Sequence, residues 1–149
     1  MSTHAVHEIS AVADLARPLK IGMLLPSSNA MAEPEIQRML PPGVNILTTR
    51  LKLAGSSKAA LLGMTEKIEE ASSLLADAAV DLIVFNCTAV STFDPSMGEQ
   101  LSSRIADASG CPATATSDAL LAAFKALQAK RIVLIRSEEH TSELQSPPL

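Results

Sequence analysis

The stretch "DLIVFNCTAVSTFDP", residues 81–95, decides the fold of this chain. Its apolar run from Leu82 to Phe85 has no polar alternation, which is typical of a strand buried on both faces of a parallel sheet. Asn86 and Cys87 end the run, and the five residues that follow, 88–92, are small or hydroxylated. The stretch therefore predicts a buried strand whose carboxyl end opens into a polar turn. It leaves open whether Cys87 is core filler or a nucleophile.

Outward from this stretch, apolar runs alternate with helical patterns along the whole chain. Strands are predicted over residues 19–25, 44–51, 80–86 and 131–135, with a weak strand over 111–117. Helices are predicted over residues 30–40, 56–80, 94–110 and 116–130. Repeated strand–helix units require a parallel sheet with right-handed crossovers. The sequence therefore predicts an α/β fold, a flavodoxin-like parallel sheet with helices on both faces.

Capping residues suggest where these helices begin and end. Ser56 or Ser57 can cap the helix over 56–80, and Thr116 or Ser117 can cap the helix over 116–130. In the helix over 94–110, Asp94 is the expected N-cap, Pro95 the first helical residue and Gly110 the C-terminal stop.

Composition bounds the class of protein. The chain has 149 residues, of which 47% are hydrophobic and 19% charged, enough for one domain with a real core. A formal net charge of -4 gives no electrostatic footprint for nucleic acid or for an anionic membrane surface. No apolar run approaches the roughly 20 residues of a membrane span, and the N-terminus does not read as a signal peptide. We therefore expect a cytoplasmic protein in which Cys87 and Cys111 are reduced.

Both ends of the chain depart from the strand–helix pattern. Residues 1–18 are expected to be a disordered leader. The tail "RSEEHTSELQSPPL", residues 136–149, is polar and has no helical stripe. One interpretation is a disordered C-terminus; the favoured one is that the tail is the translation of a sequencing-library adaptor read through at the end of a DNA fragment, so it is left out of the fold argument.

Two strand ends carry polar clusters, and ligands of parallel α/β sheets bind at the carboxyl ends of strands. Ser27, Ser28 and Asn29 follow the first strand and offer two hydroxyls and an amide of a size that suits a carboxylate. Cys87 follows the third strand, where the backbone N–H groups of Thr88 and Ala89 favour a thiolate and can hold an anionic group.

Each cluster also has a purely structural interpretation. Residues 26–29 can be a helix N-cap, and a lone cysteine at the end of a strand is more often core filler than a nucleophile. Cys111 lies between Gly110 and Pro112 and is interpreted as structural. The three histidines cannot assemble a metal set, so no metal site is predicted. The first strand leads into no glycine-rich phosphate loop, and the third ends in Asn-Cys rather than Asp, which disfavours nucleotide binding and a receiver-type phosphoacceptor site.

Three segments together resemble one family: "IGMLLPSSNAMAEPE", "FNCTAVSTFDP" and "GCPATATSDALLAAFKALQAKRIVLI". Their order and spacing are similar to the N-terminal half of the aspartate/glutamate racemase superfamily, in the branch of maleate cis-trans isomerases and arylmalonate decarboxylases. The resemblance covers about residues 19–135. It implies a cofactor-independent enzyme with two pseudo-symmetric α/β domains facing each other across a cleft, and one cysteine from each domain beside the substrate carbon.

Carried onto this chain, the resemblance makes Cys87 the catalytic cysteine of the first domain. Ser27, Ser28 and Asn29 become ligands of the substrate carboxylate, with Thr88 and Ala89 as the opposing anion-binding wall. It also implies the domain limits: residues 19–130 form the N-terminal domain, and 131–135 are the first strand of a second domain that this chain lacks. The expected partner is a small carboxylate substrate, and a homo-oligomer is possible.

The chain also departs from the family pattern. It has no tyrosine, whereas relatives place a carboxylate-binding tyrosine shortly after the strand equivalent to 131–135. Decarboxylases of the family carry glycine at the position of Cys87, so this cysteine favours an isomerase or racemase. The alternatives are a decarboxylase of the same superfamily and a non-catalytic carboxylate-binding module. With one wall of the cleft missing, the 149-residue chain alone is expected to be inactive.

Overall fold

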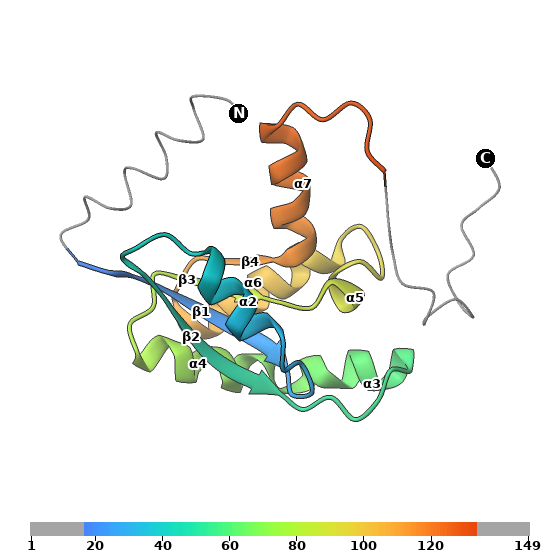
Figure 1. Ribbon diagram of the computed structural model, residues 1–149. Coiled ribbons are helices and arrows are strands. Elements are labelled where there is room, and N and C mark those ends of the chain that lie inside the picture. Colours follow the sequence, from blue (N-terminus) through green and yellow to red (C-terminus); the bar gives the residue numbers. More distant parts are fainter. Residues whose placement is uncertain (1–16, 134–149) are drawn as a thin grey trace.

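The computed structural model describes residues 17–133 and contains a four-stranded sheet in which all strand pairs are parallel (Figure 1). The expected leader up to residue 16 and the expected tail 136–149 lie outside these described residues. The strands are β1 (Leu19–Pro26), β2 (Val44–Leu51), β3 (Leu82–Phe85) and β4 (Ala113–Ala115), in the spatial order β2-β1-β3-β4. The parallel α/β prediction is confirmed, including the weak fourth strand, which is shorter than predicted.

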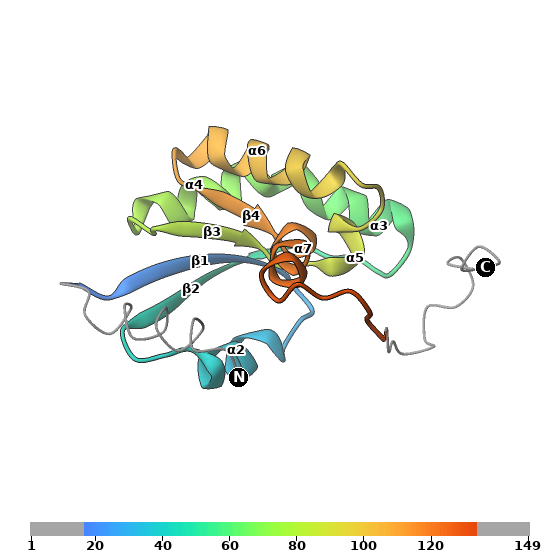
Figure 2. The same ribbon diagram turned by 90° about the horizontal axis from the view of Figure 1, so that it is seen from above.

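Helices cover both faces of this sheet, as predicted (Figure 2). On one face lie α3 (Lys58–Gly63), the 3-10 turn η1 (Met64–Lys67), α4 (Ile68–Asp77) and α6 (Met97–Ser109). On the other face lies α2 (Ala32–Met39). The single turn α5 (Thr88–Ser91) follows β3, and α7 (Thr116–Ala126) projects away from the sheet. Within residues 17–133, no helix combines the length and apolar character that a membrane crossing requires.

The hydrophobic core lies between the two inner strands and the helices α4 and α6. Leu24 of β1 and Ile83 and Phe85 of β3 are fully buried, as is Ile105 of α6. Gly22 allows α4 to pack directly on β1, because an added Cβ would lie 3.0 Å from Leu75 Cδ1. The sheet register is fixed by this core, and Leu24 pairs with Phe85, so the carboxyl ends of β1 and β3 lie side by side.

Two of the predicted helices differ from the observed ones. The helix expected over 56–80 is broken into α3, η1 and α4, since Met64 turns into the core at 2% exposure and Gly63 is a weak helix former. The helix expected from Asp94 begins at Met97 instead. The Asp94 carboxylate accepts hydrogen bonds from the backbone N–H and the hydroxyl of Ser96, so it closes a turn before the helix.

The predicted cap of α3 and the predicted stop of α6 are confirmed, whereas both predicted ends of α7 are wrong. Ser57 caps α3 by accepting the N–H of Ala60, and Gly110 ends α6 with a positive φ of 66°. Neither Thr116 nor Ser117 caps α7, whose N-cap is Ala115 with no side-chain hydrogen bond of its own. The chain leaves α7 at Ala126, four residues earlier than predicted.

The segment expected to begin a second domain carries no strand over the residues described. Residues 131–133 are exposed and irregular, and residues 134 and 135 lie outside the described part of the chain. A strand here would need pairing partners from a second domain, so the strand over 131–135 stays a prediction.

Candidate functional site

Cys87 lies at the carboxyl edge of the sheet, directly after β3. Cys87 is 9% exposed. Its backbone is extended, with φ -147° and ψ 99°, and α5 begins at the next residue. The Cys87 carbonyl accepts the N–H of Ser91 at 3.1 Å and closes this turn. The thiol therefore lies at the carboxyl end of β3, as the sequence predicts, and at the start of a single helical turn that the sequence analysis did not predict.

Burial raises the pKa of the Cys87 thiol and is the largest influence on it. The backbone N–H groups of Val90 and Ala89 act in the opposite direction and lower this pKa by less, and neither makes a capping hydrogen bond to the sulfur. The sequence led us to expect a favoured thiolate held by the N–H groups of Thr88 and Ala89. In the structure burial outweighs the effect of the turn, and anion binding by Thr88 and Ala89 stays a prediction.

The cluster after β1 lies beside this edge, but most of its polar atoms already have partners. The Ser27 hydroxyl accepts the backbone N–H of Leu53 at 3.0 Å. The Asn29 side-chain oxygen accepts the N–H groups of residues 31 and 32, both at 3.0 Å, and so closes a turn directly before α2. The structural interpretation of this cluster is met in part: Asn29 satisfies the N–H of Ala32, the first helical residue, but the N-cap itself is Met31. Within the described residues, the exposed Ser28 hydroxyl and the Asn29 Nδ2 group have no hydrogen-bond partner and could meet a ligand.

Arg50 is a site residue that the sequence reasoning missed. From the end of β2, its Nη1 group donates to the carbonyls of Ser27 at 3.2 Å and Asn29 at 2.8 Å. Its Nη2 group pairs with the Glu33 carboxylate. Arg50 thus ties the polar turn to both β2 and α2. The sequence signal that could have identified Arg50 is its position near the carboxyl end of the second predicted strand. The carboxyl ends of neighbouring parallel strands lie at the same edge of a sheet.

Asn86 is a second missed residue, and it joins three strands at this edge. Its Nδ2 group donates to the thioether of Met23 in β1 at 3.2 Å. Thr116, the first residue after β4, donates its hydroxyl to the Phe85 carbonyl at 3.0 Å and also reaches Asn86 Oδ1 at 3.5 Å. These contacts fix the backbone immediately before Cys87.

Cys111 behaves as a structural cysteine, as predicted. Both cysteines are free thiols, and the Cys111 thiol donates to the Val80 carbonyl at 3.2 Å. Burial, and then the negative charge of Asp81, raise its pKa. It receives no helix-turn N–H groups of the kind that face Cys87, and so provides an internal reference for thiol chemistry.

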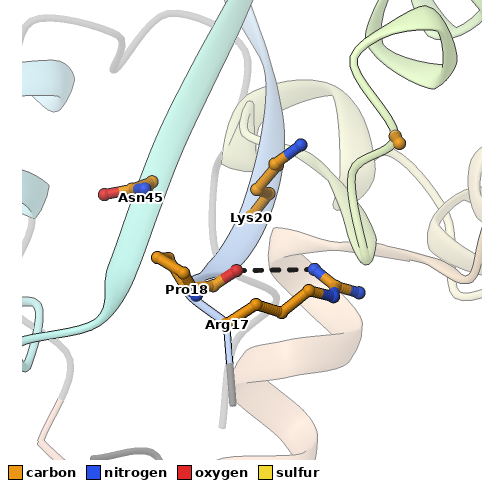
Figure 3. Close-up of a pocket in the computed structure, with 5 residues that line it drawn as sticks. Arg17, Pro18, Lys20 and Asn45 are labelled. Atoms are coloured by element: carbon orange, nitrogen blue, oxygen red, sulfur yellow. Dashed lines mark hydrogen bonds between the residues drawn. The ribbon is translucent and has the colours of Figure 1, made fainter. Parts of the chain in front are cut away.

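A hollow of about 400 Å³ lies at the opposite edge of the sheet, against the amino ends of β1 and β2 (Figure 3). Arg17, Lys20 and Asn45 are among its lining residues. Both cations are already engaged, because Arg17 pairs with Asp81 and the Lys20 ammonium donates to the Ala78 carbonyl. Because it lies against the amino ends of β1 and β2, this hollow is separate from the carboxyl edge of the sheet that holds Cys87. Among residues 17–133, no three side chains of the metal-binding types gather at one place.

Known proteins resemble this chain in sequence and in fold. The maleate isomerase of Geobacillus stearothermophilus is 27% identical over 135 residues, which are 81% of this chain and 54% of that protein. A Nocardia farcinica maleate cis-trans isomerase variant with a covalently bound succinylcysteine intermediate is 25% identical, with a TM-score of 0.65 over 74% of this chain and 49% of that one. The Pseudomonas putida S16 maleate isomerase shares the fold at 22% identity, with a TM-score of 0.67 over 76% of this chain and 51% of that one.

The chain thus spans about half the length of the relatives that it matches. The family model of the arylmalonate decarboxylases matches residues 21–142, which include the sheet apart from the first two residues of β1, and every candidate site residue. This match extends well beyond half of the sequence. The chain therefore belongs to the arylmalonate decarboxylase family.

Proposed function

We propose that this chain is the first half of a cofactor-independent isomerase or racemase that acts on a small carboxylate or dicarboxylate, with Cys87 as nucleophile or base. The observation that carries the proposal is the position of the Cys87 thiol, at the carboxyl edge of the sheet and at the start of α5, beside the polar turn that follows β1. Ser28 and Asn29, on the neighbouring strand end, supply uncommitted donors for a carboxylate. A substrate placed between them would have its reacting carbon near the sulfur.

The chemistry of a nucleophilic thiolate on maleate is simple to balance. The sulfur adds to one alkene carbon, the π bond breaks, and the other carbon takes a proton, which gives a succinyl thioether. Rotation about the new single bond, followed by loss of that proton and of the thiolate, gives the trans isomer. The succinylcysteine intermediate of the Nocardia farcinica relative is of this type. The thiolate is the form of the sulfur that makes this attack and that departs again.

The proposal includes a second wall for the cleft, supplied by a further domain. Large apolar residues of α7 and of the segment after it are exposed, as expected of a surface that another domain covers. They are Leu120, Leu121, Leu127, Ile132 and Val133. With one wall absent, a bound substrate is held from one side only. We therefore expect the 149-residue chain to react slowly with substrate and to turn over poorly.

The alternative within the same family is a decarboxylase, the activity after which the family model is named. The residue that argues against it is Cys87. The decarboxylase pattern has glycine at this position and leaves the chemistry to a cysteine of the second domain. A non-catalytic carboxylate-binding module would keep Cys87 as inert core.

The test is adduct formation at Cys87. The 149-residue chain is incubated with maleate and its cysteines are followed by peptide mass spectrometry. We expect a mass gain of one maleic acid on Cys87, its loss in Cys87→Ser, and its retention in the matched control Cys111→Ser. If the sulfur is instead a base, deuterium enters the α-carbon of a saturated dicarboxylate in D₂O without an adduct. The proposal fails if neither reaction occurs, or if Cys111 reacts first.

A further inference from the structure

Ser91, the last residue of α5, has a buried hydroxyl with two partners. Only 2% of the residue is exposed, and it is one of two buried polar residues among those described. Its Oγ donates to the Thr88 carbonyl at 3.3 Å and accepts the backbone N–H of Ser117 at 3.3 Å. The first partner lies within α5 and the second lies in α7, 26 residues away. One hydroxyl thus joins the turn after Cys87 to another helix.

This contact replaces the cap that α7 lacks. The N-cap position of α7 is Ala115, which has no capping side chain, and Ser117 is the second residue of the helix. An N-cap side chain normally accepts the N–H of that residue or the next. Here the acceptor comes from α5. The two helices are therefore fixed to each other through Ser91.

Helix α6 holds this junction from the other side through Gly98. An added Cβ at Gly98 would meet the Ser117 and Asp118 side chains, 2.8 Å from the Asp118 Cγ, so these side chains of α7 would have to shift. The Ser102 hydroxyl, which donates to the Gly98 carbonyl at 2.9 Å, also reaches the Asp118 carboxylate at 3.5 Å. The first turn of α7 is thus held in place and can serve as an anchor for α5.

The turn that faces the thiol needs such an anchor. A four-residue helix is far below the length at which a helix is stable in isolation, so its orientation depends on tertiary contacts. Val90 supplies an apolar contact, being fully buried, and Ser91 supplies the polar one. The backbone N–H of Ser91 also donates to the Cys87 carbonyl at 3.1 Å, so Ser91 is bonded directly to the residue that carries the thiol. A rotation of α5 would therefore move Cys87 and change how deeply its thiol is buried.

We propose that Ser91 is a positioning residue for Cys87: by capping α7 from α5, its hydroxyl fixes the turn that begins at Cys87 and so keeps the thiol in its buried position. The inference deepens the proposed function, on which its catalytic meaning rests. Ser72, the other buried serine, provides the contrast. It is fully buried in α4 and its hydroxyl bonds only to the Ile68 carbonyl of its own helix, at 2.6 Å.

The test measures the pH dependence of iodoacetamide alkylation at each cysteine of the 149-residue chain, for Ser91→Ala, Ser91→Thr and the matched control Ser72→Ala. We expect Ser91→Ala to lower the Cys87 midpoint by about half a pH unit, because a loosened turn buries the thiol less; this is about three-fold faster alkylation below the midpoint. Ser91→Thr, which keeps the hydroxyl, should move the midpoint back toward that of the unchanged chain. Ser72→Ala should leave it in place.

Cys111 reports on general loosening in the same experiment. The proposal is overturned if Ser91→Ala leaves the Cys87 midpoint unchanged, if Ser72→Ala shifts it equally, or if Cys111 shifts together with Cys87. Alkylation requires no substrate. A chain that forms no maleate adduct would therefore refute the proposed function, while the Cys87 profile would still decide the role of Ser91.

Discussion

Replacing Gly22 by alanine tests how closely α4 packs on the central strand β1. The new Cβ would lie 3.0 Å from Leu75 Cδ1 and 3.3 Å from Ile83 Cγ1, so its neighbours must give by a few tenths of an ångström. Both neighbours are buried, Ile83 completely, and have little room to move. Overpacking of this kind costs about 1–3 kcal/mol, and the loss of glycine freedom in the unfolded chain offsets about 0.4–1 kcal/mol. We expect Gly22→Ala to lower the free energy of unfolding by about 1–2 kcal/mol.

Urea unfolding measures this difference, with Gly63→Ala as the matched control. Gly63 has a helical φ of -58° and nothing within 4 Å of an added Cβ. That substitution should stabilise the chain by about 0.5–1 kcal/mol. Leu75→Val removes the atom closest to the new methyl group, so Gly22→Ala should cost less in its presence. The reasoning is refuted if Gly22→Ala is as stable as the unchanged chain, or if the two substitutions are simply additive.

Three further predictions concern charge, the site turn and the exposed helix. The hydrogen bond from Arg17 lowers the pKa of Asp81 to about 2, below its value in the unfolded chain. The stabilisation from this pair is therefore full above about pH 4 and is lost as the pH falls through about 2. In Arg17→Met, the midpoint of urea unfolding should depend less on pH over this range. Arg50→Ala should speed amide hydrogen exchange at residues 31 and 32, and Arg50→Lys should restore little, since one ammonium cannot replace the forked donor. The 149-residue chain should self-associate in light scattering, and Leu121→Lys with Leu127→Lys should suppress it; a monomeric unchanged chain would contradict this.

The sheet and its order of elements could be predicted because their signals are local and redundant. The run from Leu82 to Phe85 can hardly be anything but a buried strand, and Gly110 adopts the left-handed conformation that a helix stop favours. The break inside the helix over 56–80 could not be predicted in the same way. Its apolar stripe continues through Met64, and only packing against the sheet decides that this residue turns inward.

Sequence placed Cys87 and residues 27–29 at the carboxyl edge of the sheet, where the structure has them, but it did not show how their polar groups are shared. Asn29 is able either to bind a ligand or to close a turn before α2, and it was the folded neighbourhood that assigned its oxygen to the turn. Likewise Asp94 was able to cap a helix or close a turn. Arg50 and Ser91 act on partners more than 20 residues away, and no local pattern encodes such a pairing. The raised pKa of Cys87 has the same origin, since burial is a property of the whole fold.

The strand order β2-β1-β3-β4 also has a consequence for how the chain is made. β1 leaves the ribosome first, but its neighbour β3 lies 61 residues later, because Leu24 pairs with Phe85. Until Phe85 has been synthesised, one edge of β1 stays unpaired, next to side chains destined for the core. Pairing across such a separation is slow, and unpaired edges are open to wrong partners in the meantime. The nascent chain is therefore most vulnerable to misfolding while α3 and α4 are being made, before β3 closes the sheet.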